Sequence, residues 1–410
     1  MDSENKLLSM PFIINKNECT GCMACKERCP FQAISSIEDN EGFLIPIVDN
    51  DKCKKCGLCK TICPTINKIE KKHNIFESEG LILRLYDKKA LHRSASGGAF
   101  YGIAKFAIER LDAVVAGAAW TPEYGVSHIC VEDLNGLKKL QNSKYVQSNA
   151  FPVFSQIKKF LQQNRWVVFS GTPCQIAGLK AYLQNEYDRL ITIDLVCHGV
   201  PSPGFLRREF EEYSFNNKIT NICFRTKGWL TRSFFILRVF LKNRKVKDFS
   251  RNESLYYSMF LKSASFRESC YKCKYASPSR LGDFTIGDCD SYAQYPDFFP
   301  NSSNSICLIN SKKAKQLWND GISLSFDYRT LNIEKEIQVN RQLSSPSVRP
   351  KERDYIYKEL DSLDYSCLKN KYFVESKRFS FFKTKLKLMI PSCITKIIVS
   401  LKRSFPFFGG

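Results

Sequence analysis

Residues Cys19 to Pro64 carry one cysteine pattern twice. The first copy reads Cys19-Thr-Gly-Cys22-Met-Ala-Cys25-Lys-Glu-Arg-Cys29-Pro30, and the second reads Cys53-Lys-Lys-Cys56-Gly-Leu-Cys59-Lys-Thr-Ile-Cys63-Pro64. Both copies have the spacing C-x2-C-x2-C-x3-C-P, and the second lies 34 residues after the first, as Cys53 follows Cys19. Cysteines two residues apart in a tight loop can direct three thiolates at one metal cluster. The fourth cysteine, after a short helical turn, points to the opposite side.

This spacing is typical of bacterial ferredoxins with two [4Fe–4S] clusters, each held by three cysteines of one copy and the fourth of the other. The expected ligands are Cys19, Cys22, Cys25 and Cys63 for cluster one, and Cys53, Cys56, Cys59 and Cys29 for cluster two. Structural zinc and disulfides are the alternatives. Zinc sites usually show two separated C-x2-C pairs, and disulfides need an oxidising compartment, whereas the N-terminus does not resemble a signal peptide.

Length and composition indicate a folded protein of two or three domains. The chain has 410 residues, of which 43% are hydrophobic and 13% aromatic, and this composition excludes a disordered chain. No uncharged apolar run reaches the roughly 18–20 residues that span a bilayer. Eighteen cysteines without a secretory signal indicate a reducing compartment, so we expect a cytoplasmic protein.

The net charge of +21 is densest at the C-terminus. Lys369 to Gly410 holds ten Lys and Arg residues and a single acid, Glu375. We expect no nucleic-acid partner, because no recognised binding module accompanies the charge. Acidic redox partners, anionic cofactors or an anionic membrane surface explain it better. Residues Phe379 to Arg403, broken by Pro391, predict two basic amphipathic helices on the inner membrane face or on a partner. The alternative is a helix packed back on the protein's own core.

Apolar runs and turn signals predict the order of elements. We expect strands at 12–14, 33–37 and 43–48, a linker at 65–79, and a second domain from Leu81. A helix is predicted at 99–111, directly after Ser94-Ala-Ser-Gly-Gly98. Such a segment can present backbone N–H groups to an anion, or it can be an ordinary serine cap with glycines for close packing. The local sequence leaves both readings open.

A strand–helix–strand unit follows. Strands at 166–169 and 190–196 flank a helix at 175–183, which is the length of a right-handed βαβ crossover. Cys174 and Cys197 then lie beyond the carboxyl ends of neighbouring parallel strands, where open α/β sheets place their sites. Cys174 also opens a helix, which favours a thiolate. Cys270 and Cys273 form a C-x2-C half-site, and the four cysteines together predict a third [4Fe–4S] cluster or, alternatively, a structural zinc. We interpret Cys130, Cys223, Cys307, Cys367 and Cys393 as packing residues and leave Cys289 open.

Six motifs in this order resemble the beta-subunit family of coenzyme F420 hydrogenase/dehydrogenase, from about Cys19 to Arg353. They are Arg93-Ser-Ala-Ser-Gly-Gly98, Ser143-Lys-Tyr-Val-Gln-Ser148, Ser170-Gly-Thr-Pro-Cys-Gln-Ile-Ala-Gly-Leu-Lys180, Asp194-Leu-Val-Cys-His-Gly-Val-Pro-Ser-Pro203, Cys270-Tyr-Lys-Cys-Lys-Tyr275 and Gly282-Asp-Phe-Thr-Ile-Gly-Asp288. The resemblance implies FAD, a [4Fe–4S] cluster in the catalytic domain, and electron exchange with a low-potential carrier. The flavin-lining residues that it implies are Ser94, Ser96, Gly97, Gly98, Lys144, Tyr145, Gln147 and Ser148.

The chain departs from the family after Asp288. Cys289-Asp290-Ser291 stands where relatives continue with Phe-Trp-Gly, and Asn301-Ser-Ser-Asn-Ser305 replaces a glycine-rich segment. The substrate is therefore expected to differ from that of better-known members, and the deazaflavin coenzyme is not implied. Bacterial relatives often occur in surface-polysaccharide gene sets, which raises a sugar-linked acceptor as one option.

Together these features predict an α+β protein. We expect a two-cluster ferredoxin-type module at 1–72, a flavin-binding α/β domain at 73–345 and a basic amphipathic tail at 346–410. The expected function is an iron–sulfur flavoprotein oxidoreductase that relays electrons between a ferredoxin-like or other low-potential carrier and an organic substrate. The alternative is a non-catalytic electron-transfer subunit of a larger redox complex. No catalytic residue is assigned; His198 could supply a proton, but a hydrogen bond to a cluster sulfur is the preferred role.

Overall fold

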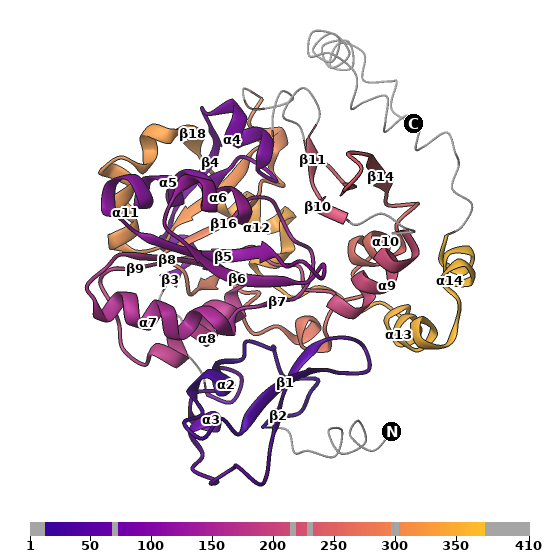
Figure 1. Cartoon of the computed structure of the whole chain (residues 1–410). Coiled ribbons are helices and arrows are strands. Elements are labelled where there is room, and N and C mark those ends of the chain that lie inside the picture. Colours follow the sequence, from indigo (N-terminus) through magenta and orange to yellow (C-terminus); the bar gives the residue numbers. More distant parts are fainter. Residues whose placement is uncertain are drawn as a thin grey trace, which may run out of the picture.

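A computed structural model of the chain describes residues 13–67, 73–213, 219–227, 233–296, 298 and 303–373. Its N-terminal module contains two short helices, α2 (Ala24–Arg28) and α3 (Leu58–Thr61), and an antiparallel hairpin of β1 (Ile34–Glu38) and β2 (Leu44–Val48). The hairpin that the sequence predicts at 33–48 is confirmed. In Figure 1 this module, in indigo, lies below the larger α/β part, and α2 packs against helix α8 (Pro173–Leu183).

The internal repeat is visible in the backbone of the two cysteine loops. Gly21 and Met23 have φ of 69° and 60°, and their counterparts 34 residues later, Lys55 and Gly57, have φ of 53° and 77°. These left-handed conformations curl each loop tightly before its helix begins. Each loop can therefore present its cysteines to one centre.

Nine strands form the central sheet in the order β18-β4-β17-β16-β9-β8-β5-β6-β7. Strands β16, β9, β8 and β5 run parallel to one another. On one side β17 pairs antiparallel with β16, and β4 pairs antiparallel with β17. The bounds are β4 (Glu79–Leu85), β5 (Val114–Trp120), β6 (Val126–Val131), β7 (Ser148–Asn149), β8 (Val167–Gly171), β9 (Leu190–Leu195), β16 (Phe284–Asp288), β17 (Ser305–Ile309) and β18 (Phe326–Thr330).

Helices cover both faces of this sheet. One core holds side chains of α5 (Ala99–Leu111), α6 (Leu134–Leu140) and α11 (Lys312–Asn319), and a second core holds side chains of α7 (Phe154–Gln162) and α8. The layers are visible in Figure 1, with α5 and α11 above the sheet and α7 and α8 below it. Burial of both faces explains why the parallel strands are nearly continuous apolar runs. The remaining helices of this part are α4 (Lys88–Arg93) and α12 (Ile333–Val339).

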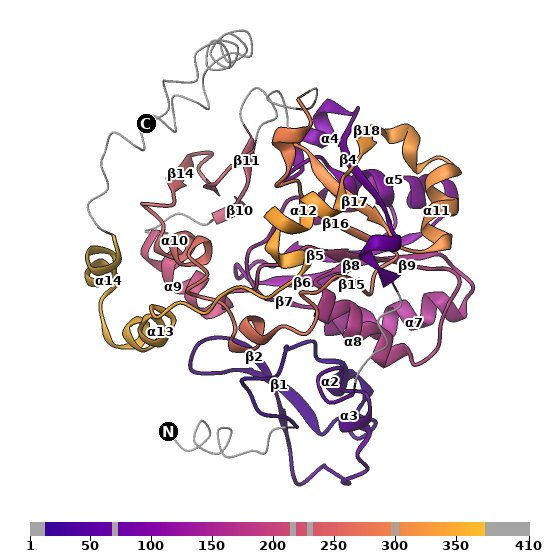
Figure 2. The ribbon, with the colours of Figure 1, turned by 180° about the vertical axis from the view of Figure 1, so that it is seen from behind.

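A third core lies beside the sheet, as the view from behind in Figure 2 shows. It joins a three-stranded sheet of β10 (Ile219–Cys223), β13 (Ile236–Leu241) and β14 (Val246–Ser250) to helices α9 (Pro203–Tyr213), α10 (Leu255–Leu261), α13 (Arg353–Ser362) and α14 (Tyr365–Tyr372). Ile356, Tyr357 and Leu368 are buried in it, so 353–372 pack against the body of the protein. The predicted tail helices at 379–403 lie outside the described residues.

Short elements complete the chain. Two-residue strands are β3 (His73–Asn74), β11 (Thr226–Lys227), β12 (Ser233–Phe234) and β15 (Ser279–Arg280); the 3-10 helices are Ile75–Glu77, Phe151–Val153, Glu268–Lys272, Tyr292–Gln294, Ile322–Ser325 and Arg341–Leu343.

Two predictions made from the sequence are wrong in these regions. Residues 13 and 14 form a bend rather than a strand, and 73–79 are no linker, because β3 pairs with β15. Of the described helices, none has the length and apolar character to cross a membrane.

Candidate iron–sulfur centres and the adjoining cavity

Four thiols from both cysteine copies meet beside α2. The pKa of Cys22 is raised to about 12, chiefly by burial and also by the neighbouring Cys19, Cys63 and Cys174. Burial also raises the pKa of Cys25 well above its ordinary value, again with contributions from Cys22, Cys19 and Cys63. Cys63 of the second copy therefore lies with three cysteines of the first. The neighbours of Cys22 and Cys25 include the members expected for cluster one, and the ligand set itself stays a prediction.

The cluster-two cysteines lie nearer to the surface. Cys56 is exposed, while Cys53, Cys59 and Cys29 are half-buried and pack together on a small core with Ile13, Cys25, Ile34 and Val48. Burial raises the pKa of Cys59, and the neighbouring Cys53 and Cys56 add to that rise. The second group therefore has one side open to solvent, which the first group lacks.

The third group combines cysteines that are far apart in sequence. Cys174 lies in the first turn of α8 after β8, Cys197 follows β9, and β8 and β9 are neighbouring parallel strands, as predicted. The pKa of Cys174 is raised to about 12, chiefly by burial and also by Cys273 and Cys270. Burial likewise raises the pKa of Cys197 well above its ordinary value, with added contributions from Cys270, Cys174 and Cys273. The expectation that the helix start favours a Cys174 thiolate is wrong for the free thiol, because burial outweighs the helix.

These three groups are neighbourhoods of thiols. Among the described residues, no three Cys, His, Asp or Glu side chains are drawn together as a formed metal site. Their donor chemistry nevertheless fits iron–sulfur clusters, since each group contains four thiols and little else that binds metal. Because buried thiols must lose their protons to bind iron, cluster binding releases protons and is coupled to folding.

Two contacts connect cluster one to the third group. A Cβ on Gly178 of α8 would lie 2.8 Å from the Cβ and 3.1 Å from the Sγ of Cys22, so the cysteine loop rests directly on this helix. Tyr275 is buried, and its hydroxyl donates a hydrogen bond of 3.0 Å to the carbonyl of Pro64. Burial raises the pKa of Tyr275, and Cys174, Cys22, Cys273 and Cys63 all contribute to that rise. Tyr275 therefore lies between the two groups of thiols.

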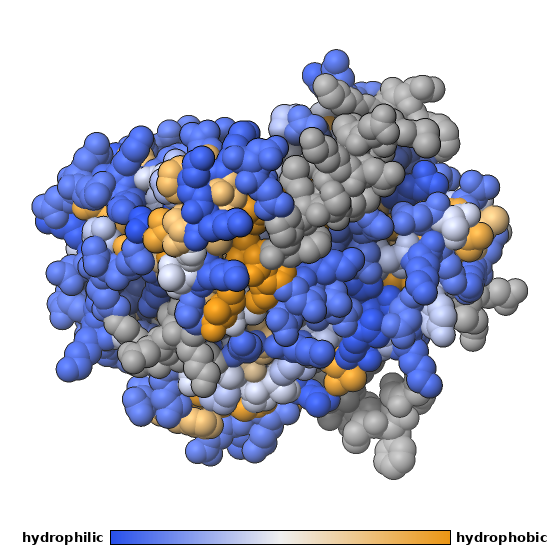
Figure 3. All heavy atoms as spheres, turned by 90° about the horizontal axis from the view of Figure 1, so that it is seen from below, coloured by the Kyte–Doolittle hydropathy of each residue, from blue (hydrophilic) through white to orange (hydrophobic). Residues whose placement is uncertain are grey.

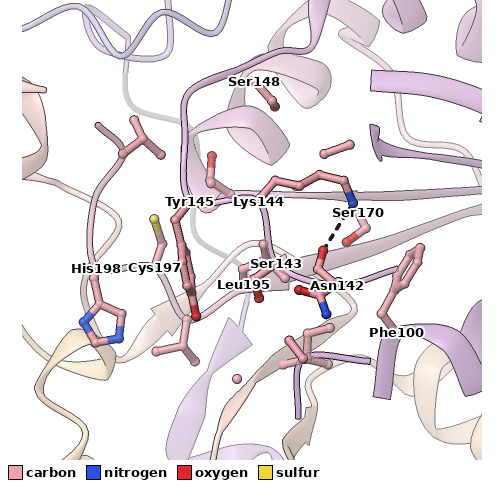
Figure 4. A pocket seen from close by; sticks show the side chains of 18 of the residues that line it. Phe100, Asn142, Ser143, Lys144, Tyr145, Ser148, Ser170, Leu195, Cys197 and His198 are labelled. Atoms are coloured by element: carbon pink, nitrogen blue, oxygen red, sulfur yellow. Dashed lines mark hydrogen bonds between the residues drawn. The ribbon is translucent and has the colours of Figure 1, made fainter. Parts of the chain in front are cut away.

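A cavity of about 440 Å³ opens at the carboxyl ends of the parallel strands. Cys174 and Cys197 lie in its wall, as do Thr20 and Gly21 of the first cysteine loop. The volume is within the range of cavities that bind cofactors or substrates. Figure 4 shows Cys197, His198 and Tyr145 around it, with Phe100 of α5 on another side. The cavity therefore borders the third thiol group directly.

The serine–glycine motif contributes both to this cavity and to packing. Ser94, Ser96 and Gly98 line the cavity, whereas Gly97 does not. A Cβ on Gly97 would lie 2.2 Å from the carbonyl oxygen of Leu83, so close packing explains this glycine. Gly98, with φ of 85°, precedes α5, and no side chain caps that helix. The cavity-lining role therefore has support at Ser94, Ser96 and Gly98, and the packing role has support at Gly97.

The Ser143–Ser148 loop lines the cavity, but most of its polar atoms bind protein groups. Lys144 Nζ donates to the carbonyls of Leu140, Gln141 and Asn142 at 3.3, 2.9 and 3.2 Å, and Figure 4 shows the last of these bonds. Burial lowers the pKa of Lys144 to about 7. This side chain therefore holds the end of α6.

Gln147 joins the two parts of the protein. Its Oε1 accepts from the Leu44 N–H at 3.0 Å, and its Nε2 donates to the Leu44 carbonyl at 3.3 Å. The Tyr145 ring stacks on Phe260 with centroids 4.2 Å apart, and its hydroxyl accepts from Arg225 at 3.1 Å. Tyr145 is thus the member of this loop whose aromatic ring lines the cavity wall.

Ser148 belongs to a buried network that sequence reasoning missed. His128 Nε2 donates to the Ser170 carbonyl at 3.0 Å, which leaves Nδ1 to accept from the Ser148 hydroxyl at 3.0 Å. Burial lowers the pKa of His128 to about 4, so the ring is neutral near pH 7. Gln175 Nε2 donates to the same Ser148 hydroxyl at 3.0 Å. His128 lies in no motif, so the sequence offered no signal for it.

The far end of the cavity is polar, and two of its residues, Arg225 and Asn340, were missed by sequence reasoning. Arg225 is buried and pairs with Asp288, and the cavity wall continues with Asp290, His198 and Asn340. Burial raises the pKa of Asp290 to about 6, and the nearby Glu336 and Asp288 add to the rise. Burial lowers the pKa of His198, and Arg225 lowers it too, while Asp288 opposes them. The sequence signal for this end of the cavity was Cys289-Asp290-Ser291, which stands where relatives continue with Phe-Trp-Gly.

Two buried acceptors of the cavity wall have no hydrogen-bond partner in the described part of the chain. They are Oδ1 of Asn142 and Oδ1 of Asn340. Buried polar atoms are almost always paired, so each fits a donor from a bound molecule. A flavin carries ring N–H and ribityl O–H donors of this kind. The cavity therefore passes a chemical test for such a group.

Comparison with known families agrees with these two parts. Residues 164–326 match the family model for the C terminus of the "Coenzyme F420 hydrogenase/dehydrogenase, beta subunit", and residues 18–67 match a 4Fe-4S dicluster domain. A segment that matches a dicluster domain thus precedes a segment that matches the C terminus of this beta subunit. The resemblance inferred from the six motifs is thereby confirmed.

Individual relatives share part of the chain. One subunit of the F(420)H(2) dehydrogenase of Methanosarcina mazei is 21% identical over 201 residues, covering 45% of this chain and 54% of that protein. Coenzyme F420-dependent sulfite reductase of Methanocaldococcus jannaschii is 26% identical over 195 residues, covering 46% and 29%. A chain of the F420-reducing [NiFe] hydrogenase complex of Methanosarcina barkeri has a TM-score of 0.44 and 18% identity, covering 64% of this chain and 90% of that chain.

The chain spans 26% to 54% of the length of the curated relatives that it matches. These matches relate the beta-subunit domain and the dicluster domain to iron–sulfur oxidoreductases and their subunits.

Proposed function

We propose that the chain is an iron–sulfur flavoprotein oxidoreductase that transfers electrons between a low-potential carrier and an organic substrate. The observation that carries this proposal is the order of the thiol groups. They run from exposed Cys56, through cluster one on α2, to Cys174 and Cys197 in the cavity wall. When bound, the clusters supply one-electron transfer and FAD couples it to two-electron chemistry.

The chain's own residues position these groups and exclude water. Cys19, Cys22 and Cys25 are buried under the contact with α8, and Tyr275 fills the space between cluster one and the third group. The wall residues Ser94, Ser96, Gly98, Tyr145 and Ser148 would surround the flavin, with Asn142 Oδ1 accepting from it. Gly97, Lys144 and Gln147 would support this wall through their contacts with the protein.

The polar end of the cavity is the proposed substrate side. Asp290 and Asn340 face the cavity beyond the third thiol group, and Arg225 is held there by Asp288. His198 neighbours Cys197, and its lowered pKa suits a neutral ring that donates a hydrogen bond toward the cluster site. Two relatives carry coenzyme F420 in their names, which makes this deazaflavin a carrier worth testing.

An acidic redox protein is the proposed electron partner of the dicluster module. Lys54, Lys55 and Lys60 are exposed around exposed Cys56. Figure 3, which views the molecule from the side that carries this module in Figure 1, shows a largely hydrophilic surface with a hydrophobic patch, in orange, near its middle. A basic rim around the point where electrons enter attracts acidic carriers, and the attraction weakens as salt increases. The basic tail and its membrane contact stay a prediction.

The second candidate is a non-catalytic electron-transfer subunit. It is favoured by the relative that is named as one subunit of a dehydrogenase. Anaerobic assays of the isolated, reduced protein with a panel of organic acceptors, sugar-linked ones included, separate the two. Turnover by the chain alone supports the enzyme, whereas a flavin that is reduced but never turns over supports the electron-transfer role. A protein that binds zinc without iron contradicts both.

A further inference from the structure

Arg267 differs from the other buried arginines of the described chain. Arg280 pairs with Asp194 at 2.8 Å, Arg353 pairs with Glu41, and Arg225 pairs with Asp288. Arg267 is 3% exposed, yet no carboxylate lies within 4 Å of it in the part of the chain that the structure describes. Asp39, whose pKa burial raises and the charge of Arg267 lowers, interacts with this cation only at longer range. A buried cation without a carboxylate in contact is costly, so this position calls for an explanation.

The Arg267 side chain reaches into the dicluster module. Its Nε donates to the carbonyl of Cys19 at 2.6 Å, and its Nη1 donates to the carbonyl of Leu44 at 2.9 Å. The guanidinium also lies 5.5 Å from the centre of the Phe43 ring. These partners orient the cation but carry no net charge, so they do not neutralise it.

The Arg267 backbone belongs to the third thiol group. Its N–H donates to Val200, three residues after Cys197, at 2.9 Å, and its carbonyl accepts from the N–H of Cys270 at 2.9 Å. One residue therefore contacts the cluster-one loop with its side chain and the third group with its backbone.

Further negative charge close to Arg267 is available in these two thiol groups. Four thiolates around one [4Fe–4S] cube give a net negative site, which becomes more negative on reduction. We propose that Arg267 is the shared countercharge of cluster one and the third cluster, and that it raises the reduction potentials of both. This inference rests on the proposed function, because it requires clusters at both groups. Net charge and hydrogen bonding around a cluster are established means of setting its potential.

The test is a redox titration of the anaerobically purified full chain, followed by electron paramagnetic resonance. Arg267→Gln removes the charge and should move the potentials of cluster one and the third cluster to more negative values. Cluster two should keep its potential, because the side-chain hydrogen bonds of Arg267 go to the cluster-one loop and to Leu44, and not to the expected ligands of cluster two. Arg267→Lys keeps the charge and should stay near the wild-type potentials. Unshifted potentials in an Arg267→Gln protein that retains its iron would overturn the inference.

Two further variants keep the result interpretable. Arg207→Gln removes an arginine that bridges the same two parts through Glu38, but this pair is partly exposed, so no potential should change. If Arg267→Gln loses iron, the redox titration is carried out on Gln147→Glu instead. This variant is suitable because the side chains of Gln147 and Arg267 both donate to the Leu44 carbonyl. A carboxylate there would neutralise Arg267 and should produce the same negative shift; an unchanged potential would contradict the inference. An iron count of zero in the wild type would instead contradict the proposed function.

Discussion

Cys22 and Gly178 are in direct contact across the junction between the dicluster module and helix α8. A Cβ on Gly178 would lie 2.8 Å from the Cβ of Cys22, which is closer than such atoms approach in proteins. The contact places a proposed ligand of cluster one against the helix that begins with Cys174. The short path from cluster one to the third group thus depends on a residue without a side chain.

Enlarging Gly178 should separate the two parts. Gly178→Ala is expected to destabilise the protein by about 1–3 kcal/mol, and Gly178→Val by more, because overpacking forces the cysteine loop or α8 to shift. Thermal unfolding of the iron-loaded chain measures the effect. Equal stability of the wild type and both variants would show that the junction is not tightly packed.

Serine at the C-x2-C half-site should remove one cluster selectively. The double variant Cys270→Ser and Cys273→Ser is expected to lose about four irons per chain and keep the eight of the dicluster module. Chemical iron analysis after anaerobic purification gives the count. Cys367→Ser, at an exposed cysteine, is the matched control and should lose none. An undiminished iron content in the double variant would exclude the third cluster.

Charge reversal beside cluster two should slow the arrival of electrons. Lys54→Glu with Lys55→Glu is expected to reduce the second-order rate of reduction by an acidic ferredoxin about tenfold at low salt, with the difference shrinking as salt rises. Stopped-flow absorbance measures the rate. Lys138→Glu with Lys139→Glu, an adjacent exposed pair on α6, is the control. Equal slowing by both pairs would mean that only net charge matters.

His128 should make the fold sensitive to acid. Its pKa falls from 6.5 to about 4 on burial, so the unfolded chain takes up a proton below pH 6.5 that the folded chain refuses. Its neutral form therefore contributes roughly 3 kcal/mol above pH 6.5, and this contribution is lost as the pH falls toward 4. His128→Gln should be less stable at pH 7 but should lose less of its melting temperature between pH 7 and 5. Parallel pH profiles for the two proteins would contradict this role.

The parts of the site that could be predicted from sequence are those set by local spacing. The βαβ pattern predicted that Cys174 and Cys197 follow neighbouring parallel strands, and this is confirmed. The cysteine intervals predict that Cys63 joins the first copy, and this ligand set stays a prediction. The prediction of a strand at 12–14 is wrong, because a short apolar run does not show whether a partner strand exists. The linker prediction failed because His73 and Asn74 pair with residues some two hundred positions later.

Tertiary contacts decided the rest. Lys144 and Gln147 stand in a motif, but their polar atoms bind backbone carbonyls that are close only in the folded chain. Arg225 and Arg267 lie outside all six motifs. The local sequence does not show whether a buried arginine has a carboxylate in contact. Cys367, interpreted as a packing residue, is exposed, because isolated cysteines carry no signal of burial.

The most direct test of the whole account is an iron, sulfide and flavin analysis of the chain purified without air. Three clusters and one flavin predict about twelve irons, about twelve sulfides and one FAD per chain. A reconstituted preparation with no iron and no flavin, colourless in the visible range, would contradict the central claim.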